Sequence, residues 1–270
     1  MFRLRVTLCI YLSACAKSFL TSWMTNTPSR GIDCKANFNH EPSTSKDSQS
    51  HQDIYGPLGK TIDLYFLQIF RSRLSEALGV DSDLPKDDYQ GIVELCAAMN
   101  ARYSNRTQVQ NVAQQVLVSI FPPWLSNFYS KYFSKPFPRF SSRLNAHAAL
   151  IVGTWLMGNC TVNDIETDES GKIGYGQGLF VKRCRFLEAS QCASTCMNAC
   201  KIPTQDFFRD SMGLPLTITP DYESFECQFS FGQKPDPHRE AELMTTPCLA
   251  RCPTGGTTRQ WHSSINCSSS

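Results

Sequence analysis

Cysteines at positions 192, 196 and 200 form the pattern in this sequence that most directly suggests chemistry. Residues four apart on an α-helix lie on one face, and each step advances about 6 Å along the axis. Three such thiols would span about 12 Å, too far for all of them to bind one ion at a metal–sulfur distance of about 2.3 Å. Two of the three could share an ion if other segments supplied the remaining ligands.

The candidate ligands belong to a cysteine-rich segment that extends from Cys184 to Cys252. Soft thiolates favour zinc, iron or an iron–sulfur cluster. Because no pair has Cys-x-x-Cys spacing, a standard structural zinc site is not indicated. The alternatives are that these cysteines pack as small hydrophobic side chains or pair as disulfides. The predicted metal ligands are Cys184, Cys192, Cys196, Cys200, Cys227, Cys248 and Cys252; whether Cys160 joins them stays open.

An aromatic segment precedes the cysteines. Trp124, Phe128 and Tyr132 are spaced by four, with Lys131 and Lys135 among them. An amphipathic segment of this kind can rest on a membrane surface and admit a lipophilic molecule. Ordinary core packing with solvated lysines is the alternative. Weaker signals include the glycines of 171–178, which lack the dinucleotide fingerprint and indicate a flexible hairpin loop.

Helices must position the aromatic segment. Apolar spacing predicts a helix that ends at Gly79, and three more over 87–99, 107–121 and 143–157. Pro122 and Pro123 stop the third helix and can open a further one, which Pro136 and Pro138 break. The apolar run of twelve residues at 146–157 is shorter than the roughly 20 that a membrane span needs.

The residue pattern changes after Gly158, from long helical segments to short strands and short helices. Strands are expected at 160–165 and 179–186, joined by a long hairpin, and again at 216–219 and 225–231. Short helices are expected at 191–201, where Pro203 ends the helix, and at 205–212. The predicted fold class is therefore α+β, with a helical N-terminal half packed with a small cysteine-rich α+β C-terminal half.

Charge is distributed unevenly along the chain of 270 residues. Residues 1–50 carry a net charge of +3, and the remainder carries −1. A body near neutrality lacks the basic surface that nucleic-acid binding needs, so no nucleic-acid partner is expected. The first 40 residues are basic, Ser-rich and contain one acidic residue, Asp33, which fits an organelle transit peptide. Arg3, Arg5 and the apolar run that follows also fit a secretory signal.

These features give four predicted regions. Residues 1–50 form a transit peptide and disordered linker, and the polar stretch 41–53 begins within this region and ends just after it. Residues 51–158 form a helical region, residues 159–256 a cysteine-rich domain, and residues 257–270 a disordered tail.

The segment from Phe180 to Pro253 contains several ordered motifs: KRCRFLE at 182–188, KIPTQDFF at 201–208, GLPLT at 213–217 and FGQ at 231–233, together with Cys227 and Pro247-Cys248. With these motifs the segment resembles the plant plastid β-carotene isomerase family of strigolactone biosynthesis. Gly158-Asn159-Cys160 resembles that family's Gly-Pro-Cys, with Asn159 in place of proline. Upstream, as far as Asp53, the likeness is weaker.

The resemblance implies a chloroplast enzyme that contains iron and interconverts all-trans and cis isomers of a carotenoid such as β-carotene, feeding strigolactone or other apocarotenoid synthesis. It favours the transit peptide over the secretory signal. It also implies a carotenoid substrate and gives peripheral membrane contact through Trp124, Phe128 and Tyr132 a purpose. No catalytic residue follows from it, and neither the nuclearity of the iron nor the double bond that rotates is specified.

A polyene double bond must lose π character before it can rotate. Electron transfer to or from iron, reversible addition of a thiolate, and protonation to a delocalised cation are three ways to achieve this. The cysteine-rich segment fits the first two. A non-catalytic metal or redox module that binds a carotenoid or a protein partner is the alternative function.

Overall fold

The computed structural model describes residues 50–103, 105–166 and 171–244. The predicted transit peptide and C-terminal tail lie outside the described residues, as do the candidate ligands Cys248 and Cys252. The predicted linker overlaps the first described helix, which begins at Ser50.

The N-terminal half is helical, as predicted. Its elements are α2 (Ser50–Leu78), α3 (Gln90–Arg102), α4 (Arg106–Ile120), α5 (Pro123–Tyr129), the π-helical turn η1 (Ser130–Ser134) and α6 (Pro138–Met157). Gly79 ends α2 at φ +68°, in the left-handed region that favours glycine, and its N–H donates to the Ser75 carbonyl. Helix α6 begins five residues earlier than predicted because Pro138 occupies its first turn, where proline is tolerated.

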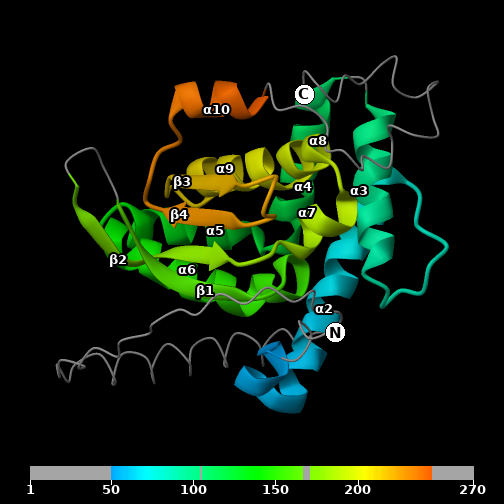
Figure 1. Ribbon diagram of the computed structural model, residues 1–270, viewed down its shortest axis with the longest axis horizontal. Helices are drawn as coiled ribbons and strands as arrows, with labels where there is room; N and C mark the ends of the chain where they lie inside the picture. The colour runs from blue at the N-terminus through cyan, green and yellow to red at the C-terminus, as the bar shows by residue number, and fades with distance from the viewer. Residues whose placement is uncertain (1–49, 104, 167–170, 245–270) are drawn as a thin grey trace. The chain divides into compact units, whose positions relative to one another are not determined.

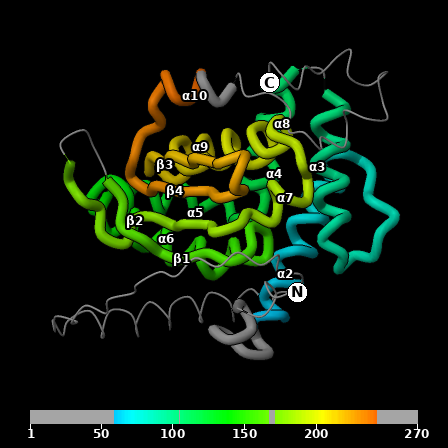
Figure 2. The backbone as a smooth tube through the Cα atoms, in the orientation of Figure 1, coloured from blue at the N-terminus to red at the C-terminus, as the bar shows by residue number. Residues whose placement is uncertain are grey.

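A four-stranded sheet occupies the C-terminal half, with the spatial order β1-β2-β4-β3 (Figures 1 and 2). The strands are β1 (Cys160–Glu166), β2 (Ile173–Val181), β3 (Leu216–Pro220) and β4 (Cys227–Phe231). All three pairings are antiparallel. Helix α6 packs against β1, β2 and β4. The predicted fold class is confirmed.

Strand β2 is where the strand prediction was wrong. It covers Ile173–Val181 instead of 179–186, so Gly174, Gly176 and Gly178, which were expected in a flexible loop, are part of the sheet. Gly178 lies opposite Asn163 of β1 and Ser230 of β4. A Cβ at this position would come within 2.2 Å of the Asn163 side chain and 2.6 Å of the Ile165 side chain. Glycine is therefore required because neighbouring side chains cross over the backbone.

The helical segment between the two strand pairs is longer than predicted. It begins at α8 (Ala193–Thr195) and continues through the π-turn η2 (Cys196–Lys201), α9 (Ile202–Asp206) and the π-turn η3 (Phe207–Ser211). Pro203 was expected to end a helix, but the helical backbone passes through it. A proline ring clashes with the carbonyl four residues earlier in an α-helix. The wider turn of η2, where the Ile202 N–H donates to the Met197 carbonyl, accommodates this ring.

One buried core joins the two halves. Leu74, Ile92 and Met99 of the helices pack in the same cluster as Leu179 and Phe229 of the sheet. Two further helices border the sheet region, α7 (Arg185–Ser190) and α10 (Pro237–Met244). Within the described residues, no helix is both long and apolar enough to cross a bilayer.

Candidate functional site

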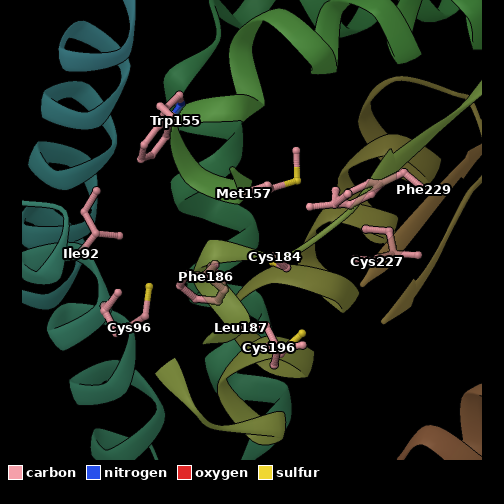
Figure 3. Close-up of a cluster of buried hydrophobic side chains, with 14 of the residues drawn as sticks. Ile92, Cys96, Trp155, Met157, Cys184, Phe186, Leu187, Cys196, Cys227 and Phe229 are labelled. Atoms are coloured by element: carbon pink, nitrogen blue, oxygen red, sulfur yellow. The ribbon is translucent and has the colours of Figure 1, made fainter. Parts of the chain in front are cut away.

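Three predicted cysteine ligands meet in the core although they come from separate elements. Cys184 precedes α7, Cys196 begins η2 and Cys227 begins β4. Figure 3 shows their side chains within one buried cluster, and each is at most 7% exposed. The Cys184 N–H donates to the Phe225 carbonyl at 2.7 Å, which ties the start of α7 to the loop between β3 and β4.

The sheet register places a further thiol near this group. Val181 of β2 lies directly between Cys160 of β1 and Cys227 of β4. Residues directly opposite one another project from the same face of a sheet, so the two cysteines flank Val181 at about 10 Å, twice the strand spacing. The Cys160 thiol donates to the Gly158 carbonyl at 3.1 Å. Cys160 therefore borders the group rather than joining Cys227 directly.

The stripe of three cysteines is not formed as predicted. The helix begins at Ala193, and Cys192 precedes it in extended conformation, after Gln191 in the left-handed region. Cys192 is buried, but it is not part of the core cluster that contains Cys184, Cys196 and Cys227. Cys200 is half-buried and packs against that cluster.

Burial dominates the electrostatics of these thiols. It raises the pKa of Cys196 and of Cys227 well above the ordinary value, and the neighbouring thiols raise both pKa values further. Burial also raises the pKa of Cys184, where the amides of Leu187 and Phe186 at the start of α7 oppose it. The thiols are therefore protonated at neutral pH.

Lys201 is the cation that acts on the pKa values of Cys196 and Cys227. Its side chain is 0% exposed, and its ammonium donates to the Gln205 amide oxygen at 3.1 Å and to the Glu240 carboxylate. Burial lowers the pKa of Lys201, whereas Glu240 raises it. The ammonium in turn lowers the pKa of Cys196 and Cys227, but by less than burial raises them.

Sequence reasoning missed Tyr222, which belongs to the turn between β3 and β4. Its hydroxyl is buried and lies beside the Cys196 thiol, close enough for a hydrogen bond between the two to affect the pKa of each. Burial raises the pKa of Tyr222, and Cys196 and Cys227 raise it further, so the phenol stays neutral. No local motif identifies Tyr222, because its neighbours in space come from η2 and β4 rather than from its own segment.

The predicted metal site can be tested only in part. Within the described residues, no three His, Cys, Asp or Glu side chains are grouped so that they could hold a metal ion. The described cysteines alone therefore do not provide a three-ligand iron site. A site that also uses Cys248 or Cys252 stays a prediction.

The aromatic segment lies at the surface. Trp124, Phe128 and Tyr132 are exposed on α5 and η1, with ring centroids 6.1 Å and 5.0 Å apart along the row. The alternative of core packing is wrong for these three side chains. His147, in contrast, is half-buried on α6, and its ring Nδ1 lies 2.8 Å from the Arg143 carbonyl oxygen.

Comparisons with known proteins match the segment that contains these thiols. The family model described as "Beta-carotene isomerase D27-like, C-terminal" matches residues 155–240. The chain is 29% identical over 212 residues to the chloroplastic β-carotene isomerase D27 of Arabidopsis thaliana, covering 78% of this chain and 75% of that protein. It is 27% identical over 176 residues to the protein of the same name from Medicago truncatula, covering 65% and 67%.

No solved structure matches the chain significantly. The matched residues contain Cys184, Cys196, Cys227 and Tyr222, so the family likeness includes the buried thiol group described above. Residues 155–240 therefore match the C-terminal region of the D27-like β-carotene isomerase family, and the chain as a whole is similar to the two chloroplastic isomerases named above.

Proposed function

We propose that this protein catalyses cis/trans isomerisation of a carotenoid double bond in the chloroplast, with all-trans and 9-cis β-carotene as the first substrates to test. The observation that carries the proposal is that residues 155–240, which match the isomerase family, contain the buried thiols. The relatives named above are chloroplastic β-carotene isomerases. A product of this class would supply strigolactone or other apocarotenoid synthesis.

The protonation states bear on how a double bond could be activated. Thiolate addition needs an ionised cysteine, but burial raises the pKa of Cys184, Cys196 and Cys227. Protonation of the polyene would need a strong acid, and thiols with raised pKa values are weak ones. We therefore propose that these side chains exclude water from the bound polyene and surround it with neutral, polarisable groups.

Activity is the first measurement. The full chain, purified under reducing conditions, is incubated anaerobically in detergent micelles with all-trans or with 9-cis β-carotene, and the isomers are separated by chromatography. Both starting isomers should approach one common mixture faster than they do without protein. Cys196→Ala and Cys227→Ala should each slow the approach at least tenfold, which corresponds to about 1.4 kcal/mol in the barrier.

Cys96→Ala is the matched control, because Cys96 is equally buried but belongs to α3, outside the matched residues. It should retain its rate. If neither isomer changes with wild-type protein although carotenoid remains bound, the alternative function of a non-catalytic carotenoid-binding module would replace the proposal.

Iron dependence is a separate proposal that requires a ligand from Cys248 or Cys252. We expect the Cys248→Ala/Cys252→Ala double variant to lose most of its bound iron, because the described residues do not supply a three-ligand site. Iron per chain would be measured by elemental analysis after anaerobic purification. Cys96→Ala is the control that should keep its iron, because Cys96 is not a predicted ligand and lies in α3, outside the matched residues. Equal iron in all three proteins would contradict this ligand assignment.

Peripheral membrane contact through Trp124, Phe128 and Tyr132 is the remaining part of the proposal. Exposure of these rings supports it, since carotenoids are lipophilic and must reach the protein from an apolar phase.

A further inference from the structure

The exposed aromatic residues continue into a second apolar stripe on α6. Phe140, Leu144, Ala148 and Val152 are spaced by four, so they lie along one face of that helix, and all four are exposed. Phe137, immediately before α6, is 60% exposed. An outward-facing apolar stripe on a helix is unusual, because the apolar side of a surface helix normally faces the core.

Hydrogen bonds hold the two stripes together. The Tyr129 hydroxyl, at the end of α5, shares a hydrogen bond with the Ser141 hydroxyl at 2.7 Å and accepts one from the Asn145 side chain at 2.7 Å. The Ser134 hydroxyl of η1 also shares a hydrogen bond with the Ser141 hydroxyl of α6 at 3.3 Å. The aromatic row and the α6 stripe are therefore carried by one braced pair of helical elements, which Figure 1 shows close together. These two stripes are called the α5–α6 face below.

The charged side chains that α5, η1 and α6 themselves carry have one sign. From Arg106 to Asn163 the sequence contains no aspartate or glutamate. Lys131, Lys135 and Arg139 are exposed between and beside the aromatic residues. The Lys131 ammonium lies 5.4 Å from the centre of the Tyr132 ring, so apolar and cationic groups alternate at close range.

We propose that the α5–α6 face docks on the surface of a bilayer that contains anionic lipids. Trp and Tyr rings favour the membrane–water interface, and basic side chains beside them are attracted to anionic headgroups. The exposed side chains of α5, η1 and α6 include no carboxylate, so the α5–α6 face itself would not repel anionic headgroups. A role of this docking in delivering carotenoid rests on the proposed isomerase function, whereas lipid binding itself does not.

Vesicle flotation tests the docking. The full chain is mixed with vesicles of phosphatidylcholine alone or with about a third phosphatidylglycerol, then floated through a density gradient. Protein should float with the anionic vesicles, more weakly with the neutral ones, and less as salt is raised. Each basic residue near an anionic surface contributes about fivefold in affinity, so Lys135→Gln/Arg139→Gln should weaken binding about thirtyfold.

Matched variants separate docking from general effects. Lys182→Gln/Lys234→Gln makes the same charge change outside the α5–α6 face and should float like wild type. Trp124→Ser/Phe128→Ser should abolish flotation, while Val80→Ser, which alters an exposed apolar residue near the end of α2, should not. Circular dichroism confirms that each variant is folded.

Two outcomes would overturn the proposal. One is equal flotation of the wild type and both α5–α6 variants. The other is absence of flotation together with a dimer, seen by size-exclusion chromatography, that Trp124→Ser/Phe128→Ser dissociates, since the face would then bind a second copy. Isomerase activity is measured separately in detergent micelles. Loss of activity there with normal flotation counts against the proposed function only, and the reverse result counts against docking only.

Discussion

The buried thiols keep their protons over a wider pH range than exposed cysteines do. Cys96 shows this most simply, because burial is the sole cause that raises its pKa to about 12. In the unfolded chain the same thiol would titrate near its ordinary value of 9.0. Below that pH both states hold the proton, whereas between the two values only the unfolded state loses it. Alkaline pH therefore favours unfolding.

We predict that the free energy of unfolding falls as pH rises above about 9, by about 1.4 kcal/mol per pH unit for each thiol that ionises only on unfolding. Cys96→Ala should lower stability at neutral pH but make this decline shallower by one such group. Urea unfolding under reducing conditions, at pH values from about 8 to about 11, measures both effects. An identical pH slope in wild type and Cys96→Ala would contradict the raised pKa.

The Gly-rich composition of strand β2 does not identify this segment as a strand. Its glycines favour a loop by propensity, yet the strand lies in the interior of the sheet, between β1 and β4. The Gln228 side chain of β4 crosses over Gly178 and exchanges hydrogen bonds with the Asn163 side chain of β1 at 2.9 Å and 3.1 Å. The absence of a side chain at residue 178 makes room for this bridge.

We predict that Gly178→Ala lowers the free energy of unfolding by about 2–3 kcal/mol, because the new methyl group would displace Asn163 and Ile165. Tyr175→Thr in the same strand is the control, since Tyr175 is exposed and threonine retains strand propensity. It should change stability by less than about 0.5 kcal/mol. Denaturant unfolding of both variants is the measurement. Equal stabilities would show that the bridge over Gly178 is not rigid.

On the scale of the whole described body, a buried ion pair joins distant parts of the chain. Lys201 of η2 and Glu240 of α10 are 39 residues apart, and the Lys201 ammonium has no exposure to solvent. Gln205 completes the link to the sheet, because its side-chain oxygen also accepts from the Ile218 N–H of β3 at 2.8 Å. The pair thus fixes α10 beside the cysteine-rich core.

We predict that Glu240→Ala destabilises the protein by about 3 kcal/mol, because it leaves the Lys201 ammonium buried without its carboxylate. Lys201→Met/Glu240→Leu should cost much less, since neither charge remains to be desolvated. A double-mutant cycle by denaturant unfolding, completed with the single variants Lys201→Met and Glu240→Leu, measures the coupling. Additive effects of the two single variants would mean that the pair contributes no coupling energy.

The sequence alone determined the features that depend on residues close together in the chain. Helical periodicity and capping located the end of α2 and the helices α3, α4 and α5 to within a few residues, because apolar spacing, Gly79 and Pro123 act locally. Long ordered motifs also indicated the family before any geometry was known. The boundary of α6 and the position of β2 were less accurate, since proline and glycine permit more than one local structure.

Only the tertiary structure decided which cysteines meet. Local spacing suggested Cys192, Cys196 and Cys200. The fold gathers Cys184, Cys196 and Cys227, keeps Cys200 beside them, leaves Cys192 outside the cluster and adds the Tyr222 phenol. These residues are brought together by strand pairing and by the packing of α7 and η2, which depend on contacts between segments far apart in sequence. The protonation of the thiols also depends on the tertiary structure. Burial raises their pKa values, and only the assembled core buries them.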